Sequence, residues 1–172
     1  MARQTPPEAI REAVELVAQM RSVQLATVGR DAAPLASYAP FVQLDGALYV
    51  YLSRLAQHAQ NLRATPLLSA MLICDEASCE EIFARPRLVL DCTVTEHARD
   101  GALFDSVLER FETRFGETAS TVRELTDFSL FRLRPHGARL VSGFARALNL
   151  DDDAMLAVFG DAFSAPPTDG NE

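Results

Sequence analysis

The chain has 172 residues, 48% of them hydrophobic, which predicts one globular domain with a sizeable core. Its net charge of −8 argues against binding to nucleic acid or to an anionic membrane, because both need a basic surface. All 16 basic residues are arginine, which excludes lysine Schiff-base chemistry and leaves arginine, histidine and backbone amides to hold an anion.

Targeting and redox signals are few. No window approaches ~18 consecutive apolar residues, and the N-terminal residues MARQTPPEAIRE lack the apolar stretch of a secretory signal. We therefore expect a cytoplasmic protein. The three cysteines Cys74, Cys79 and Cys92 lack the paired spacing of a zinc site, so we expect free thiols in a reducing compartment.

The first predicted element is a helix that ends near Arg21. Thr5 is its expected N-cap, and Glu8 completes a capping box three residues later. An apolar stripe then follows at helical spacing, which predicts a face that packs on the core: Ile10, Ala13, Val14, Val17 and Met20.

Three strands are predicted next, over Ser22–Val28, Leu35–Gln43 and Ala47–Leu52. The short turn at 44–46 predicts that the last two form an antiparallel hairpin. Pro34 and Pro40 predict an edge or bulged strand, since proline cannot donate to a ladder.

The stretch Tyr49–Pro66 changes from strand to helix spacing within a few residues. Ser53 is the expected N-cap, and Arg54 and His58 stand beside the positive end of the helix dipole. This combination predicts an anion site. The alternative is an ordinary strand-to-helix junction that binds nothing.

The second half of the chain adds strands and helices in turn. An apolar run at 67–74 predicts a strand covered on both faces, and an acidic connection follows at 75–83. Clean alternation then predicts a long strand over Arg85–Thr95. Apolar spacing predicts a helix from Leu103 to Gly116, with a further turn or two over Thr118–Leu125.

The predicted barrel ends with a hairpin of two strands, Asp127–Leu133 and Ala138–Phe144, joined at residues 135–137. Acidic residues from Asp151 suit a helix N-terminus, and the residues beyond Phe163 are expected to be disordered. The pattern as a whole predicts a mainly β (α+β) protein, a small antiparallel barrel with flanking helices. Residues 1–150 form the expected barrel domain with its N-terminal helix, and residues 151–172 an acidic helix and tail.

Several strings resemble the pyridoxamine 5'-phosphate oxidase-like, FMN-binding split-barrel superfamily, and within it the haem-utilisation branch of small haem-binding and haem-degrading proteins. The strings are ASYAPFVQ (36–43), YLSRLAQHAQNL (51–62), SAMLICDEA (69–77), IFARPRLVLD (82–91) and DFSLFRLRPHGARLVSGFARA (127–147). The resemblance implies a six-stranded antiparallel split barrel that forms a homodimer, with two cofactor sites at the subunit interface.

The same resemblance implies an FMN site. Basic and hydroxyl side chains would hold its phosphate, at Ser53, Arg54, His58, Arg85 and Arg87, where His58 replaces a lysine of the oxidase. The flavin ring would lie along Ser37, Tyr38 and Ala39, with Tyr51 in the same cofactor-binding set.

Three functions follow from this resemblance. The first is an FMN-dependent oxidoreductase acting on an unknown small molecule. Pyridoxamine phosphate itself is not the expected substrate, because the oxidase's C-terminal Trp and Arg-x-His region has no counterpart here and the chain has no tryptophan. The alternative is a haem-binding protein with His58, His136 and Asp127 as candidate residues; no histidine follows the closing strands, so the branch's usual C-terminal axial ligand is missing and degradation is not expected. The third is a family member that keeps the dimer and binds nothing.

Overall fold

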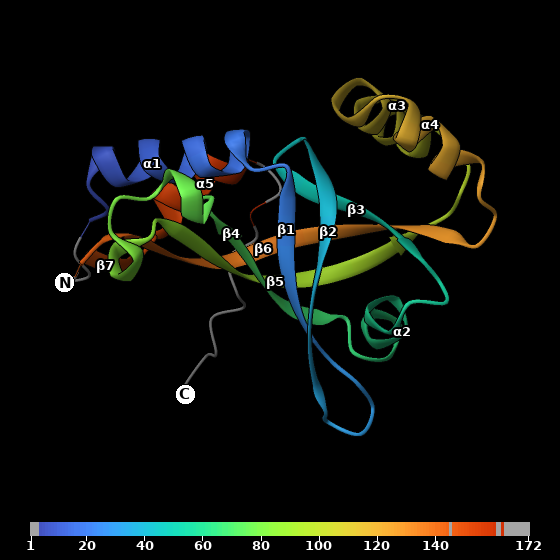
Figure 1. Ribbon diagram of the computed structural model, residues 1–172, viewed down its shortest axis with the longest axis horizontal. Coiled ribbons are helices and arrows are strands. Elements are labelled where there is room, and N and C mark those ends of the chain that lie inside the picture. Colours follow the sequence, from blue (N-terminus) through green and yellow to red (C-terminus); the bar gives the residue numbers. More distant parts are fainter. Residues whose placement is uncertain (1–3, 145, 161–162, 164–172) are drawn as a thin grey trace, which may run out of the picture.

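Six antiparallel strands close into a barrel in the computed structural model, which describes residues 4–144, 146–160 and 163 (Figure 1). Around the barrel the order is β1, β2, β3, β6, β5 and β4, and β7 extends the sheet beside β6. The strands are β1 Ser22–Val28, β2 Pro34–Leu44, β3 Ala47–Ser53, β4 Leu67–Ile73, β5 Arg87–His97, β6 Phe128–Gly143 and β7 Arg146–Asn149. The predicted six-stranded barrel is confirmed.

Five α-helices of the described chain flank the barrel. They are α1 Pro7–Gln19, α2 Gln57–Ala64, α3 Ala102–Phe115, α4 Glu117–Glu124 and α5 Asp152–Phe159, and two short 3-10 helices lie at 76–78 and 82–84 in the acidic connection. Figure 1 places α1 and α5 together at one end of the barrel, α2 at another end and the α3–α4 pair to one side. No helix among the described residues is long and apolar enough to span a membrane.

The buried side chains form two clusters. The larger one fills the barrel and continues into α1 and α5, and it takes its members from the inward face of each strand, as in the alternation of Leu88, Leu90 and Cys92 along β5. The smaller one lies outside the barrel wall, where Phe104, Leu108 and Phe111 of α3 pack on β2, β3 and β6. The two clusters leave the outer face of β1 and β4 uncovered.

One expectation for this part of the sheet is confirmed and one is wrong. β2 pairs with β1 over 34–40 and with β3 over 41–44, so each part has a ladder on one side only, as predicted for an edge strand, and Pro40 stands where one partner is exchanged for the other. β4 is buried on one face only: Leu68, Ala70 and Leu72 point inward and the residues between them are partly exposed. The turn at Asp45 and Gly46 does join a hairpin, and both residues have positive φ.

The predicted closing hairpin is also wrong. β6 is one continuous strand of 16 residues that runs through Pro135 and Gly137. A register shift in its pairing with β5 skips His136, so the expected turn residues form a bulge that Pro135 tolerates. The hairpin lies later, between β6 and β7.

The N-terminal cap differs from its prediction as well. Pro6 is the N-cap of α1 and makes no side-chain capping bond, so the Thr5–Glu8 capping box does not form. The Thr5 hydroxyl instead accepts a hydrogen bond from the Asp151 backbone at 3.0 Å. The predicted disorder beyond Phe163 falls outside the described residues.

Candidate functional site

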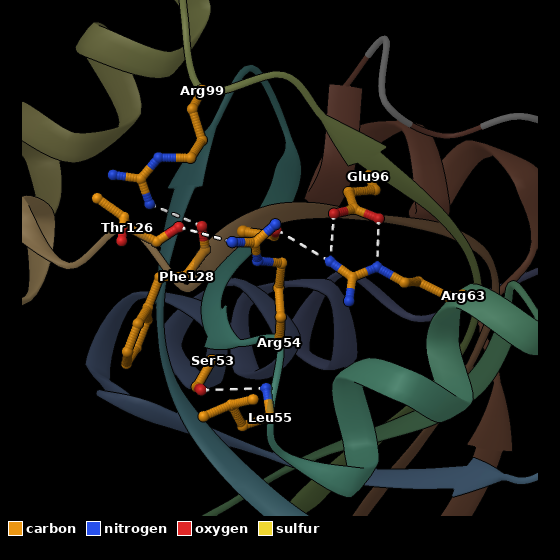
Figure 2. A network of polar contacts seen from close by, with 9 residues as sticks. Ser53, Arg54, Leu55, Arg63, Glu96, Arg99, Thr126 and Phe128 are labelled. Atoms are coloured by element: carbon orange, nitrogen blue, oxygen red, sulfur yellow. Dashed lines mark hydrogen bonds and ion pairs between the residues drawn. The ribbon is translucent and has the colours of Figure 1, made fainter.

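The strand-to-helix junction is built around Ser53 and Asp127. β3 ends at Ser53, whose hydroxyl donates to Asp127 Oδ2 at 2.7 Å. The same hydroxyl accepts from the Leu55 amide at 3.2 Å (Figure 2). α2 begins only at Gln57, after an Ala56 N-cap without a side-chain bond. The prediction that Ser53 caps this helix is therefore wrong, because Ser53 links β3 to the start of β6.

Arg54 is the available cation at this junction. Its backbone amide donates to the Asp127 carbonyl at 2.7 Å, and its Nη2 donates to the Thr126 carbonyl at 2.9 Å. The side chain is exposed, and within the described part of the chain it forms no ion pair. Arg54 thus retains unused guanidinium donors for an external anion.

Two further residues complete the polar network around Arg54 (Figure 2). Arg63 of α2 pairs with Glu96 at the end of β5, with Nε 2.8 Å from Oε2, and also donates to Ser129 at 3.0 Å. The hydrogen bonds from Arg63 lower the pKa of Glu96 against the opposing effect of burial. Sequence patterns did not single out either residue, because a strand-end carboxylate and a helix arginine are both ordinary surface features.

Arg99 ties the neighbouring loop to the barrel. It donates to the Tyr51 hydroxyl at 2.5 Å and to the carbonyls of Leu125 and Phe128, both at 2.7 Å. Its guanidinium also lies 5.7 Å from the ring centroids of Tyr51 and Phe104. Arg99 was not predicted either, since its partners come together only when the barrel closes.

His58 faces β2 and not Arg54. Its Nδ1 lies 3.1 Å from the Ser37 hydroxyl, and burial lowers its pKa, so the imidazole is neutral at pH 7. When Nδ1–H donates to Ser37, Nε2 keeps its lone pair. His58 is consequently suited to metal ligation and poorly suited to holding a phosphate.

The three predicted ring-binding residues of β2 point in different directions. Ala39 is buried in the core, whereas Tyr38 is 69% exposed on the outer face. Ser37 and Tyr38 line a hollow of about 540 Å³ on the outer face of β1, β2 and β4, whose floor includes Ala26, Met71 and Val89. Ser37 pairs with the buried Leu25, so its hydroxyl and His58 lie on the opposite face of β2 from Tyr38 and this open, largely apolar hollow.

The remaining predicted residues lie elsewhere in the chain. Arg85 bonds to the Cys74 carbonyl at 2.6 Å and Arg87 to the Arg85 carbonyl at 3.0 Å. Arg87 begins β5 and Glu96 is near its end, so about 30 Å of strand separates them at ~3.3 Å per residue. Tyr51 is buried on the α3 side of the barrel wall. One chain alone does not gather the predicted phosphate set.

The histidines and thiols form no metal centre on their own. His136 occupies the β6 bulge, and His97 lies 6.3 Å from the Tyr49 ring with a pKa lowered by burial. Across the described ranges no three metal-binding side chains cluster. The three cysteines are free, as predicted, and burial strongly raises the pKa of Cys92.

Comparison with known proteins places these features in a family. Residues 8–142 match the family described as pyridoxamine 5'-phosphate oxidase. The chain is 38% identical over 145 residues to the protein named haem oxygenase HutZ from Vibrio cholerae, covering 84% of this chain and 82% of that one.

Solved structures agree with this assignment. The HutZ crystal structure, described as a haem storage protein, has a TM-score of 0.71 at 39% identity and covers 79% of this chain and 94% of that one. Campylobacter jejuni ChuZ has a TM-score of 0.82 at 28% identity, over 88% of this chain and 63% of that one. The chain belongs to the pyridoxamine 5'-phosphate oxidase family of split barrels.

Proposed function

We propose that this chain is a haem-binding protein of haem utilisation. The support is its 38% identity to a protein named for haem oxygenation, over more than four-fifths of both chains. This reverses the order expected from sequence, in which an FMN-dependent oxidoreductase came first. Haem would supply an iron centre whose properties depend on its ligand and surroundings.

His58 is the proposed iron ligand. The environment of this side chain is the structural observation on which the proposal depends. A haem ligand must be a neutral imidazole with a free ring nitrogen, and burial keeps His58 in that form. Ser37 holds the other nitrogen at 3.1 Å, which fixes the ring orientation. His136 is the second candidate. It lies in the partly buried bulge of β6, where no described residue forms such a hydrogen bond with its ring.

The proposed anion contact is Arg54. The haem propionates need cations with unused donors, and Arg54 stands four residues before His58, exposed and without an ion pair in the described chain. Asp127 would act indirectly, because its carboxylate and carbonyl hold Ser53 and the Arg54 backbone.

A haemin titration followed at the Soret band tests this assignment. We expect wild type to shift the band, and His58→Ala to weaken binding by about tenfold or more. Arg54→Gln should weaken it by about three- to tenfold, because one exposed charge-assisted contact is lost. His136→Ala is the matched control and should bind as wild type does. A missing Soret shift, or equal binding by His58→Ala and wild type, would contradict the proposal.

Adding FMN to the same samples shows which of the two cofactors the protein binds. Quenching of flavin fluorescence by wild type, without any response to haemin, would favour the oxidoreductase. We expect a response to haemin and no quenching of flavin fluorescence. Haem binding should also persist as the pH falls below 6.5, the ordinary pKa of histidine, because the pKa of His58 is lowered and its ring stays neutral.

The partner in this proposal is a second copy of the chain. The outer face of β1, β2 and β4 carries Tyr38 at 69% exposure beside small residues such as Ala26, Ala36 and Ser69, and a homodimer would cover it. Light scattering should then give twice 18.8 kDa, the mass of one chain. Ser69→Arg, which adds a charge to this face, should shift the mass toward one chain; a wild type that is monomeric at high concentration would remove the proposal.

A further inference from the structure

A second cavity lies on the other side of the barrel wall, beneath α3 and α4. Its volume is about 300 Å³, and it opens between the outer face of β2 and β3 and the two helices. Three aromatic rings line it, those of Tyr51, Phe111 and Phe115, and Arg21 stands at its edge. This volume is at the lower end of the range for small-molecule pockets.

The cavity exists because α4 packs less closely than α3. Four residues of α3 are buried on the barrel, whereas α4 has none. The helix positions that face the sheet from α4 carry the short side chains Ala119 and Val122, which are only partly buried. Large rings on one wall and short side chains on the other leave the space unfilled.

Positive charge gathers at one side of this cavity without a matching carboxylate. The Arg21 and Arg114 guanidinium carbons lie 5.3 and 5.9 Å from the centre of the Phe115 ring. Neither arginine forms an ion pair with another described residue. Burial lowers the pKa of Arg114, and the charge of Arg21 lowers it further. A bound anion would relieve this like-charge repulsion.

The two arginines have different roles. Arg114 donates to the Met20 carbonyl at 2.5 Å and to the Ala18 carbonyl at 3.2 Å, so its donors hold the end of α1. The Arg21 side chain is exposed, and its only hydrogen bond to a described residue is a long one, 3.4 Å to the Arg114 carbonyl. Arg21 is therefore the group able to contact a ligand, and Arg114 adds to the positive potential.

We propose that this cavity binds a small flat aryl carboxylate, with its rings among Tyr51, Phe111 and Phe115 and its carboxylate on Arg21. A cavity of roughly 150 Å³ suffices for one benzene ring, so about twice that volume admits two fused rings. Aromatic walls favour offset and edge-to-face contacts with such a ligand. The site is separate from the proposed haem surface, because Tyr51 faces α3 and Ser37 does not.

Calorimetric titration with 2-naphthoate and with its neutral amide, 2-naphthamide, tests the charge requirement. Wild type should bind the carboxylate about tenfold more tightly than the amide, because only the carboxylate forms charge-assisted bonds with Arg21. Arg21→Gln should remove this difference, and Arg11→Gln, an exposed arginine on α1, should keep it. Equal affinity of wild type for both compounds would overturn the proposal.

A second pair of variants tests the location. Ala119→Phe and Val122→Phe each fill the cavity and should abolish binding of both compounds. Ser120→Phe adds the same ring to the exposed side of α4 and should bind as wild type does. Thermal unfolding of each variant establishes that it is folded. Unchanged binding by both filled variants, or equal loss in Ser120→Phe, would contradict the assignment.

Discussion

At the scale of single residues, Asp151 joins the two ends of the described chain. One carboxylate oxygen accepts from the Thr5 amide at 2.6 Å and the other caps α5 by accepting from the Ala154 amide at 2.9 Å. These backbone hydrogen bonds, first that of Ala154 and then that of Thr5, lower the pKa of Asp151. A carboxylate stabilised in this way contributes to folding only while it is ionised.

The substitution Asp151→Asn should therefore change the pH dependence of stability. Asparagine can still cap a helix, but it carries no charge. Because the folded pKa of Asp151 lies below its ordinary value of 3.8, its contribution is present above about pH 5 and disappears as the pH falls through the folded pKa. We expect the variant to be less stable by about 0.5–1 kcal/mol at pH 7, a modest value because the group is near solvent.

Urea denaturation at pH 7 and near pH 3 measures this difference. The difference in unfolding free energy between wild type and Asp151→Asn should be smaller at the lower pH. Asp152→Asn is the control. It removes the same charge from the same helix turn, but the hydrogen bonds from the Thr5 and Ala154 amides go to Asp151 and not to Asp152. A gap of equal size at both pH values would count against the role of the charge.

At the scale of elements, Gly116 separates α3 from α4. Its φ is +69°, its amide donates to Glu112 at 2.8 Å to end α3, and its carbonyl accepts from Ala119 at 2.9 Å to begin α4. A Cβ here would meet no atom within 4 Å, so only the backbone conformation opposes a side chain. The angle between the helices, and with it the cavity beneath α4, depends on this residue.

Gly116→Ala should cost about 1–3 kcal/mol of unfolding free energy, because the combination of φ +69° and ψ −147° is one that essentially only glycine adopts. Gly143→Ala is a matched control, because Gly143 has no positive φ and its added Cβ would make an ordinary 3.6 Å contact with Arg146. Chemical denaturation compares the two. Equal losses would show that the conformation of Gly116 is not the cause.

Local patterns predicted the elements well where one rule dominated. Alternation located β5 to within two residues, because its inward face is buried without exception from Leu88 to Val94. The same reasoning failed for β6, where Pro135 and Gly137 have the composition of a turn. Pairing with both β3 and β5 holds this strand together, and neither pairing is visible in a local window.

The candidate site shows the same limit. Ser53, Arg54 and His58 were predicted as one anion site from their spacing, yet Ser53 bonds to Asp127, 74 residues away, and His58 bonds to Ser37 on another strand. Their partners depend on how the barrel closes. Arg63 and Glu96 went unnoticed for the same reason, because their ion pair joins α2 to β5.

At the scale of the whole molecule, the barrel core continues into helices from both ends of the sequence. α1 and α5 pack together over one end, and their buried residues belong to the same cluster as the strand interiors. Figure 1 shows these two helices side by side against the barrel. Residues 151–172 were predicted as an acidic helix and tail, and α5, which lies within them, shares the core of the barrel.

Phe159→Ala tests whether α5 is required for the stability of the whole barrel. Phe159 is fully buried among core side chains, so truncation removes apolar contacts and leaves a cavity, with an expected loss of about 3–4 kcal/mol. Leu156→Ala, on the same helix but 53% exposed, should cost less than about 0.5 kcal/mol. Urea denaturation should show one transition for both variants, at a lower midpoint for Phe159→Ala. Similar small losses would mean that α5 only rests on the barrel, and an early separate transition would mean that it unfolds independently of the strands.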